Sequence, residues 1–264
     1  MVHAGCAAIV ELWRTEQHHE QLSNYRHVRP TEPIDTLPNN GSGSPVAYTG
    51  MTWSGFRPSD DACQYGYNIP AQLMAAKALR QIVDFAQLWS DTALAEQATK
   101  LREEILTGVN RYGIIGGCYA YEVDGLGNQL RMDDANMPSL LSLPLVSDVV
   151  VDDPIYLATR NWVLGADNPF YYQGSYASGV GSPHTPQGFV WHIGLAVQGL
   201  TGSVDEGIEC LRTILDTDGG TGWTHESFDP NNPVEFTREW FSWSNSMACE
   251  LMMKLVLDTR NEIN

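Results

Sequence analysis

The chain has 264 residues, of which 43% are hydrophobic and 18% are charged. This length can bury a core in one large or two small domains, and the composition is that of a folded globular protein. Thirty-two acidic against fifteen basic residues give a formal net charge of −17, which would repel nucleic acid and an anionic membrane surface. We therefore expect neither nucleic acid nor a membrane as a partner.

The first apolar stretch contains Glu11 and Arg14, and no cationic segment precedes it. That pattern is typical of a helix and not of a signal peptide. The five cysteines are scattered singly and odd in number, which predicts buried free thiols and neither disulfides nor a zinc site. Both observations favour a cytoplasmic location.

Apolar residues recur every three or four positions in most periodic segments, so we predict a mainly α fold with about eight helical stretches. Cap residues and helix breakers suggest where these helices begin and end. The predicted helices include one around residues 9–13, one over 73–89, one over 90–112, one opening at Asp153–Pro154, one opening at the Ser203-x-x-Glu206 capping box, and one over 240–257. In the second of these, the residues expected to face the core are Leu73, Ala76, Leu79, Val83 and Phe85–Ala86.

Long loops rich in Gly, Pro, Asn, Asp and Trp separate the helices, over residues 29–60, 113–138, 165–189 and 216–238. Loops of more than roughly 12–15 residues in a compact domain are usually functional. Long polar loops alternating with helices are the pattern of a helical toroid, in which the loops gather into a pocket. The glycines between 116 and 128 suit a small hairpin inside one loop. Because no repeat and no linker is visible, we assign residues 1–264 to a single domain.

The segment GMTWSGFRPSDDA places two adjacent carboxylates, Asp60 and Asp61, after Arg57. A structural interpretation is that one of residues 59–61 caps the following helix, because acidic side chains favour a helix N-terminus. A functional interpretation is that one carboxylate pairs with Arg57 and stays ionised while the other keeps a proton. The ring of Trp53 would help by excluding water.

The segment GWTHESF places Glu226 beside His225, between Trp223 and Phe228. A glutamate among aromatic residues in a loop is hard to explain as a solvated surface charge, although that alternative stays open. Further along, Glu239 is expected to start the last helix rather than to act in chemistry.

Two more segments carry polar residues that suit a site. MDDANMPSL contains Asp133, Asp134 and Asn136, and a helix cap would explain any one of them. GSPHTPQGFVWHIG places His184 in a proline-flanked loop and Trp191 before a predicted helix. We predict His192, on that helix, to be a core histidine, whereas His184 suits a core or a functional role equally.

Signatures of metal and nucleotide chemistry are missing from the sequence. His18–His19–Glu20 lacks ligand spacing because adjacent helical residues point to different faces, and HExxH is absent. A serine nucleophile elbow, a P-loop and a dinucleotide fingerprint are also absent. We expect no metal and no cofactor. Carboxylates in aromatic loops then indicate acid–base chemistry on a neutral polyol, as in glycoside hydrolysis.

Four motifs together resemble glycoside hydrolase family 125, the metal-independent exo-α-1,6-mannosidases: GMTWSGFRPSDDA, MDDANMPSLLSLP, GSPHTPQGFVW and HESFDPNNPVEFTREWFSW. The resemblance runs in order from about Pro30 over nearly the whole remaining chain. It implies an (α/α)6 barrel, and removal of one terminal mannose at a time from a mannose-containing oligosaccharide or glycan with inversion at the anomeric carbon. Because family members are longer, it implies that this chain is the C-terminal part of the barrel, whose open face would favour self-association.

The resemblance also implies roles for individual residues. The general acid of the family is an Asp and the base a Glu, which match Asp60 and Glu226. Asp60 would protonate the glycosidic oxygen, and Glu226, roughly 6.5–9.5 Å away, would deprotonate a water attacking the opposite face. The side chains implied to hydrogen-bond mannose are Arg57, Asp61, Asp134, Asn136, His184, His225 and Arg238. The rings implied to stack on it are Trp53, Trp191 and Trp243.

Two other functions stay open at this point. A non-catalytic mannose- or glycan-binding relic of the same fold would explain the aromatic loops without needing Asp60 and Glu226 as a pair. A metal-dependent mannosidase would lose its activity when a chelator is added, and we expect no such loss.

Overall fold

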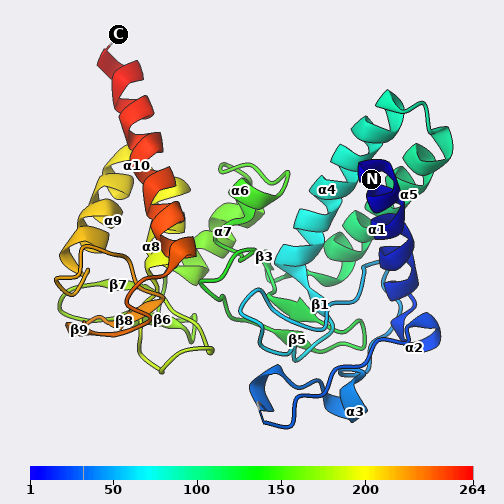
Figure 1. Cartoon of the computed structure of the whole chain (residues 1–264), viewed down its shortest axis with the longest axis horizontal. Coiled ribbons are helices and arrows are strands. Elements are labelled where there is room, and N and C mark those ends of the chain that lie inside the picture. The colour runs from blue at the N-terminus through cyan, green and yellow to red at the C-terminus, as the bar shows by residue number, and fades with distance from the viewer. Residues whose placement is uncertain (32, 264) are drawn as a thin grey trace. The chain divides into compact units, whose positions relative to one another are not determined.

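The computed structural model describes residues 1–31 and 33–263, with side chains described as far as Asp258. Within these residues it contains ten α-helices joined by loops and short antiparallel strand pairs (Figure 1), so the predicted mainly α class is confirmed. The chain divides into two compact units, residues 1–131 with 146–156 and residues 132–145 with 157–264. A single domain over 1–264 stays a prediction.

The first unit is built from three substantial helices and a small sheet. Its helices are α1 (Val2–Glu16), α2 (His19–Leu22), α3 (Pro38–Gly41), α4 (Ile69–Leu88) and α5 (Thr92–Tyr112), with a 3-10 turn at Pro33–Asp35. Its strands are β1 (Tyr67–Asn68), β2 (Ile114–Ile115), β3 (Cys118–Tyr119), β4 (Glu122–Val123) and β5 (Gln129–Leu130). Strands β1, β4 and β5 form an antiparallel sheet in that order, and β2 pairs with β3. The predicted hairpin is therefore confirmed, and a second one accompanies it.

Helices α4 and α5 pack against each other and form the centre of the first unit. On α4 the buried residues at helical spacing include Leu79, Ile82 and Ala86. Phe85, which we expected in the core, is 44% exposed and instead stacks on Trp89 with ring centroids 5.7 Å apart. Phe85 directly precedes Ala86, and adjacent helical residues point about 100° apart, so its side chain lies at the edge of the buried stripe formed by Leu79, Ile82 and Ala86.

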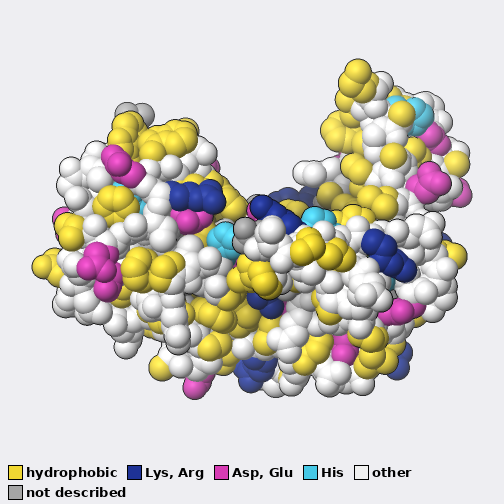
Figure 2. All heavy atoms as spheres, turned by 60° about the horizontal axis from the view of Figure 1, so that its bottom comes forward, with side chains coloured by type: hydrophobic (Ala, Val, Ile, Leu, Met, Phe, Trp, Pro, Cys, Tyr) yellow, Lys and Arg dark blue, Asp and Glu magenta, His cyan; other side chains and the backbone are white. Residues whose placement is uncertain are grey.

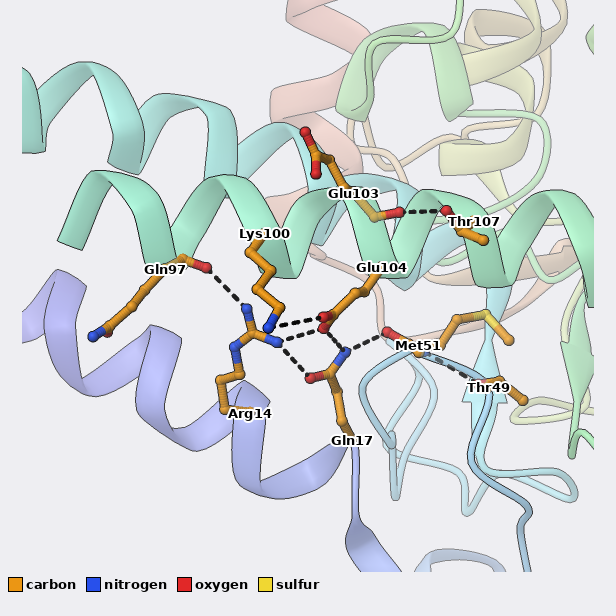
Figure 3. Close-up of polar contacts among 10 residues, drawn as sticks. Arg14, Gln17, Thr49, Met51, Gln97, Lys100, Glu103, Glu104 and Thr107 are labelled. Atoms are coloured by element: carbon orange, nitrogen blue, oxygen red, sulfur yellow. Dashed lines mark hydrogen bonds and ion pairs between the residues drawn. The ribbon is translucent and has the colours of Figure 1, made fainter. Parts of the chain in front are cut away.

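Polar contacts tie the end of α1 to α5 and to the loop that follows α3 (Figure 3). Arg14 donates to the Glu104 carboxylate and to the Gln97 carbonyl oxygen, the latter at 3.1 Å. Gln17, buried beside it, donates from Nε2 to Glu104 at 3.1 Å and to the Gly50 carbonyl oxygen. The start of the GMTWSGF segment is thus held against two helices.

The second unit contains three packed helices and two strand pairs. The divide between the units passes through α6 (Leu143–Val146) and α7 (Pro154–Val163). The elements of the second unit proper are β6 (Tyr171–Gln173), β7 (Ser178–Val180), α8 (His192–Leu200), α9 (Val204–Asp216), β8 (Ser227–Asp229), β9 (Asn232–Thr237) and α10 (Ser242–Ile263). Strand β6 pairs with β7 and β8 with β9, both antiparallel.

Helices α8, α9 and α10 enclose an apolar core that also contains Val190 and Phe228. Glycines permit the close approach: a Cβ at Gly199 would lie 3.0 Å from Leu251, and one at Gly207 would lie 2.9 Å from Leu255. The face of α10 that includes Met253 is exposed. The self-association that we predict for the chain stays a prediction.

All five cysteines are free, as predicted. Cys6, Cys63 and Cys210 are buried, whereas Cys118 is half-buried and Cys249 is exposed on α10, so the expected burial holds for three of them. Acidic side chains are dispersed over the face drawn in Figure 2 and are not gathered in one patch. In the described part of the chain, no helix combines the length and apolar character needed to cross a membrane.

Candidate active site

In the first unit, Asp60 lies at the tip of a tight loop. The backbone N of Arg57 donates to the carbonyl oxygen of Asp61 at 2.8 Å, and the N of Asp60 donates to the carbonyl oxygen of Arg57 at 3.1 Å. Below this turn, Phe56 and Ala62 form an antiparallel bridge. Asp60 adopts a φ of 73° and is exposed, whereas Asp61 is buried at 2% exposure. The loop therefore presents Asp60 outward and turns Asp61 inward.

Neither carboxylate caps a helix. Helix α4 begins at Ile69, and its cap is Asn68, whose side-chain oxygen accepts a hydrogen bond from the Ala71 N at 3.1 Å. The capping interpretation of residues 59–61 is wrong because the helix begins eight residues further along the chain. A helix cap therefore does not explain the two acidic residues.

Arg57 pairs with a residue that the sequence did not single out. Its Nε lies 2.6 Å from Oε1 of Glu122, a fully buried carboxylate on β4. Burial by itself lowers the pKa of the Arg57 guanidinium, but the adjacent Glu122 outweighs burial and raises it. The Nε of Arg57 is thus bonded to Glu122, a partner that we did not predict. The contact of Arg57 with mannose stays a prediction.

A pocket of about 260 Å³ adjoins Asp60 in the first unit. Its other lining residues are His27, Arg29, Asp35 and Phe56, and Arg29 donates from Nη1 to Asp35 at 2.7 Å. Our sequence prediction missed these residues. Their only signal was that they lie in or beside the long loop 29–60, which also carries the predicted acid. The pocket supplies both donors and acceptors beside a carboxylate.

Trp53 is buried against a histidine, and its predicted stacking on mannose stays a prediction. The indole is 9% exposed, and His19 stacks on it with ring centroids 3.7 Å apart and planes at 10°. His19 contacts Glu16 through Nδ1 at 2.6 Å and the Ser42 carbonyl oxygen through Nε2 at 2.8 Å. Together these contacts join α1, α2 and the loop that carries Trp53.

The buried His19 pair makes the stability of the first unit depend on pH. Burial lowers the pKa of His19, but the hydrogen bonds to Glu16 and Ser42 outweigh it, so the pKa is raised above the ordinary histidine value of 6.5. A raised folded-state pKa contributes stability that is fully present below the unfolded-state pKa and is lost as the pH rises through the folded-state pKa. We expect the free energy of unfolding in urea to fall as the pH rises above 6.5, and His19→Gln to weaken that dependence. The neighbouring His18→Gln variant should keep it; equal slopes in both variants and the wild type would contradict the assignment.

In the second unit, Glu226 is a buried carboxylate paired with Arg238. Glu226 is 6% exposed, so the solvated-surface alternative is wrong. Its Oε1 lies 3.2 Å from Nε of Arg238. The hairpin explains the meeting: Ser227 on β8 is opposite Thr237 on β9, so the residues just beyond them face each other. The Arg238 side chain is 61% exposed, and its guanidinium lies 5.6 Å from the centre of the Phe241 ring.

His225 uses both ring nitrogens within the protein. Its Nδ1 lies 2.7 Å from the Glu239 carbonyl oxygen and its Nε2 lies 2.9 Å from that of Asp218. The ring is fully buried and stacks on Phe236 at 3.8 Å. His225 thereby connects the loops that carry Asp218 and Glu239 beside the strand that begins next to Glu226. Its contact with a sugar stays a prediction.

His192 is a core histidine, as predicted. The backbone N of His225 donates to its Nδ1 at 2.9 Å, which leaves the ring proton on Nε2, 2.9 Å from the Thr217 hydroxyl. Burial, and to a smaller extent the nearby His225, lowers the pKa of His192 to about 3. The neutral ring therefore serves as a fixed acceptor beneath the Glu226 strand.

The MDDANMPSL segment folds into a buried polar cluster of the second unit. Asp133 accepts the backbone N–H groups of Leu140 and Leu141, which precede α6, so it holds a turn and does not cap a helix. Burial raises the pKa of Asp133 to about 8. Asp134 accepts two hydrogen bonds from Asn136, at 3.0 and 2.7 Å. Asp134 and Asn136, the two predicted sugar-binding side chains of this segment, are both buried.

Ser182 links this cluster to the loop that carries His184. Its hydroxyl lies 3.4 Å from Nδ2 of Asn136 and accepts the backbone N–H of His184 at 3.1 Å. The structure therefore brings together Asp134, Asn136 and His184, which are predicted from two separate motifs. The sugar contacts of these three residues stay predictions.

Trp191 and Trp243, the two remaining rings that we predicted to stack on mannose, differ in exposure. Trp191 is 1% exposed, donates from Nε1 to the Thr185 hydroxyl at 2.8 Å, and meets Phe241 edge to face. It therefore packs in the interior of the unit, and its predicted stacking on mannose stays a prediction. Trp243, on α10, is half-buried, and the centroid of its ring lies 6.4 Å from that of the Phe241 ring.

Asp60 belongs to the first unit and Glu226 to the second. Within each unit, the carboxylate comes with neighbours that fix its surroundings: Arg57 and Glu122 below Asp60, and Arg238 beside Glu226. Among the described residues, no group of three or more His, Cys, Asp or Glu side chains is placed to hold a metal ion. The pairing of Asp60 and Glu226 across a sugar stays a prediction.

Comparison with known proteins identifies the family. Residues 2–253 match the metal-independent alpha-mannosidases of glycoside hydrolase family 125, and the chain belongs to that family. The chain is 41% identical over 241 residues to the meiotically up-regulated gene 157 protein of Schizosaccharomyces pombe, and the match covers 88% of this chain and 47% of that protein.

Solved structures agree with the family. The chain is similar to a metal-independent α-mannosidase of Streptococcus pneumoniae in a non-productive complex with α-1,6-mannobiose, with 44% identity and a TM-score of 0.93. That match covers 96% of this chain and 61% of the streptococcal chain. A glycosidase variant, F290Y, matches at 18% identity and a TM-score of 0.50 over 77% of this chain and 55% of its own, and shows the fold alone. The predicted α/α-barrel class is thereby confirmed, and the chain spans about half to three fifths of the length of the two closer relatives.

Proposed function

We propose that this chain is an α-mannosidase that removes terminal non-reducing α-1,6-linked mannose with inversion at the anomeric carbon. The observation that carries the proposal is its 44% identity to a metal-independent α-mannosidase whose structure holds α-1,6-mannobiose. The outward-facing Asp60 and the buried Glu226, which pairs with Arg238, support it, because glycoside hydrolysis needs one carboxyl that donates a proton and one carboxylate that accepts one.

In the proposed mechanism, Asp60 donates its proton to the glycosidic oxygen as the bond to the leaving sugar breaks. Glu226 accepts a proton from a water that attacks the opposite face of the mannose ring, so the product is β-mannose. The Arg238 guanidinium, whose Nε lies 3.2 Å from Oε1 of Glu226, holds the Glu226 carboxylate in place for that proton transfer. Asp61, Asp134, Asn136 and His184 are the proposed hydrogen-bonding residues for the mannose hydroxyls.

A second candidate is a mannose- or glycan-binding relic without catalysis. The observation that favours it is the polar pocket beside Asp60, whose lining residues His27, Arg29 and Asp35 offer hydrogen-bonding groups to a sugar without Glu226. Such a relic would keep the polar pocket beside Asp60 but would not need Glu226 to be a base.

One experiment separates the two candidates. The chain is incubated with α-1,2-, α-1,3- and α-1,6-linked mannobiose, free mannose is measured, and binding is followed by calorimetry in parallel. We expect mannose release from the α-1,6 isomer, unchanged by a chelator because the family is metal-independent. Heat of binding without mannose release would support the relic, and loss of activity with the chelator would contradict the proposed mechanism.

A further inference from the structure

Glu122 is a buried carboxylate whose described partners all belong to the loop that carries Asp60. The side chain is fully buried on β4. One oxygen accepts from Nε of Arg57 at 2.6 Å, and the other accepts the backbone N–H groups of Gln64 and Tyr65 at 2.8 and 2.9 Å. One side chain thus holds three donors of a single loop.

These donors come from both arms of that loop. Arg57 precedes Asp60 and Gln64–Tyr65 follow it, so Glu122 joins the two arms below the tip. Asp60 itself has a φ of 73°, in the left-handed region that residues other than glycine seldom adopt. Such a conformation persists when the surrounding structure fixes it. The contacts of Glu122 supply that constraint.

Stability alone does not explain a largely buried ion pair at this position. Removing two charges from water is costly, and a well-packed apolar pair of similar volume is often at least as stable. What the charged pair provides is geometry, because a carboxylate can accept from a guanidinium and from two backbone amides at the same time. The same loop in an apolar setting would lose the contact that joins its two arms.

We propose that Glu122 is a positioning residue that holds Asp60 where it can protonate the glycosidic oxygen. This inference rests on the proposed mannosidase activity. A sugar leaving group needs that proton, and a misplacement of about 1 Å can cost about 100-fold in rate. An aryl leaving group that departs as a stabilised phenolate does not need it. Glu122 therefore affects the two kinds of substrate differently.

The test compares Glu122→Gln on α-1,6-mannobiose and on 2,4-dinitrophenyl α-mannoside. The amide can accept through one atom only and turns a donor toward Arg57 or toward the loop amides, so the anchor is disrupted with little change in volume. We expect kcat on mannobiose to fall by about 100-fold with KM nearly unchanged, and kcat on the aryl mannoside to change by less than about threefold.

A matched control lies two residues away. Asp124 is also buried, but its carboxylate accepts from Leu126 N and Asn128 N and so fixes the β4–β5 turn, not the Asp60 loop. Asp124→Asn should lower the free energy of unfolding, and any loss of kcat should be the same on the two substrates.

Glu122→Gln leaves a buried arginine without its carboxylate, so the double variant Arg57→Met/Glu122→Gln is made as well. It should show the same difference in kcat loss between mannobiose and the aryl mannoside. Hydrogen exchange at the Gln64 amide should accelerate in both Glu122 variants.

The outcomes are distinct. Equal loss on both substrates, or no loss on mannobiose in a folded variant, would overturn the positioning role while leaving the mannosidase proposal intact. A wild-type chain that hydrolyses neither substrate would overturn the mannosidase proposal and the inference with it. The expected split in both Glu122 variants, with none in Asp124→Asn, supports the inference.

Discussion

Replacing Glu226 by alanine is expected to lower turnover of every mannoside by about 1,000-fold or more, because no other group is proposed to accept the proton of the attacking water. The quality of the leaving group should not matter, since the defect lies on the nucleophile's side of the bond. Initial rates on α-1,6-mannobiose and on 2,4-dinitrophenyl α-mannoside measure this.

Azide makes the test of Glu226 specific. The anion needs no deprotonation, so it can replace water in the alanine variant and yield a β-mannosyl azide from an aryl mannoside. The exposed Glu235, on the same hairpin and hydrogen-bonded to Asn232, provides the control: Glu235→Gln should keep wild-type rates. Absence of azide rescue together with a folded variant, or an active Glu226→Ala protein, would show that Glu226 is not the base.

Replacing Asp60 by alanine is expected to have the complementary effect. Turnover of α-1,6-mannobiose should fall by about 100- to 10,000-fold, the usual contribution of a general acid. Turnover of the dinitrophenyl mannoside should stay near the wild-type rate, because that leaving group departs without a proton. Steady-state kinetics on the two substrates measure the contrast.

The neighbouring carboxylate is the necessary comparison for Asp60. Asp61 is buried, whereas Asp60 is exposed beside a pocket. We expect Asp61→Asn to reduce the turnover of both substrates to a similar degree. If the leaving-group contrast appears in Asp61→Asn and is missing in Asp60→Ala, the acid is Asp61 and our assignment is wrong.

The helices could be predicted because their ends depend on local chemistry. Asp91 caps α5 by accepting from Leu94 N, Asp153 accepts from Ile155 and Tyr156 before α7, and Ser203 accepts from Glu206 N at α9. Each of these bonds joins residues two or three positions apart, so the sequence shows both partners. The capping box is half-formed, because the Glu206 carboxylate accepts from Arg160 and Gln198 and not from Ser203.

The partners of site residues were harder to predict because they come from distant segments. Arg57 and Glu122 are 65 positions apart and meet through a sheet whose pairing the sequence does not specify. The available signal was a lone glutamate among the aromatic and apolar residues 119–123. Likewise, both ring nitrogens of His225 contact backbone carbonyl oxygens. Every residue has a backbone carbonyl, so the sequence gives no sign of which residues supply these contacts.

The pairing of Glu226 with Arg238 was easier to predict than the distant contacts of Arg57 and harder than the local helix caps. The residues are twelve apart, and the intervening DPNNP contains turn-forming residues, so a hairpin that brings them together could have been proposed. The burial of aromatic residues in the predicted loops could not be predicted from the sequence. Trp53 and Trp191 lie in loops, yet both are buried, because these loops pack on the units and do not extend into solvent.

The most direct measurement of the central claim is time-resolved proton NMR of α-1,6-mannobiose with the wild-type chain. If two carboxyl groups act on opposite faces of the sugar, the first signal to appear is the anomeric proton of β-mannose, with α-mannose following only as the free sugar mutarotates. α-Mannose as the first product would require a covalent intermediate or attack from the same face, and would contradict the roles given to Asp60 and Glu226.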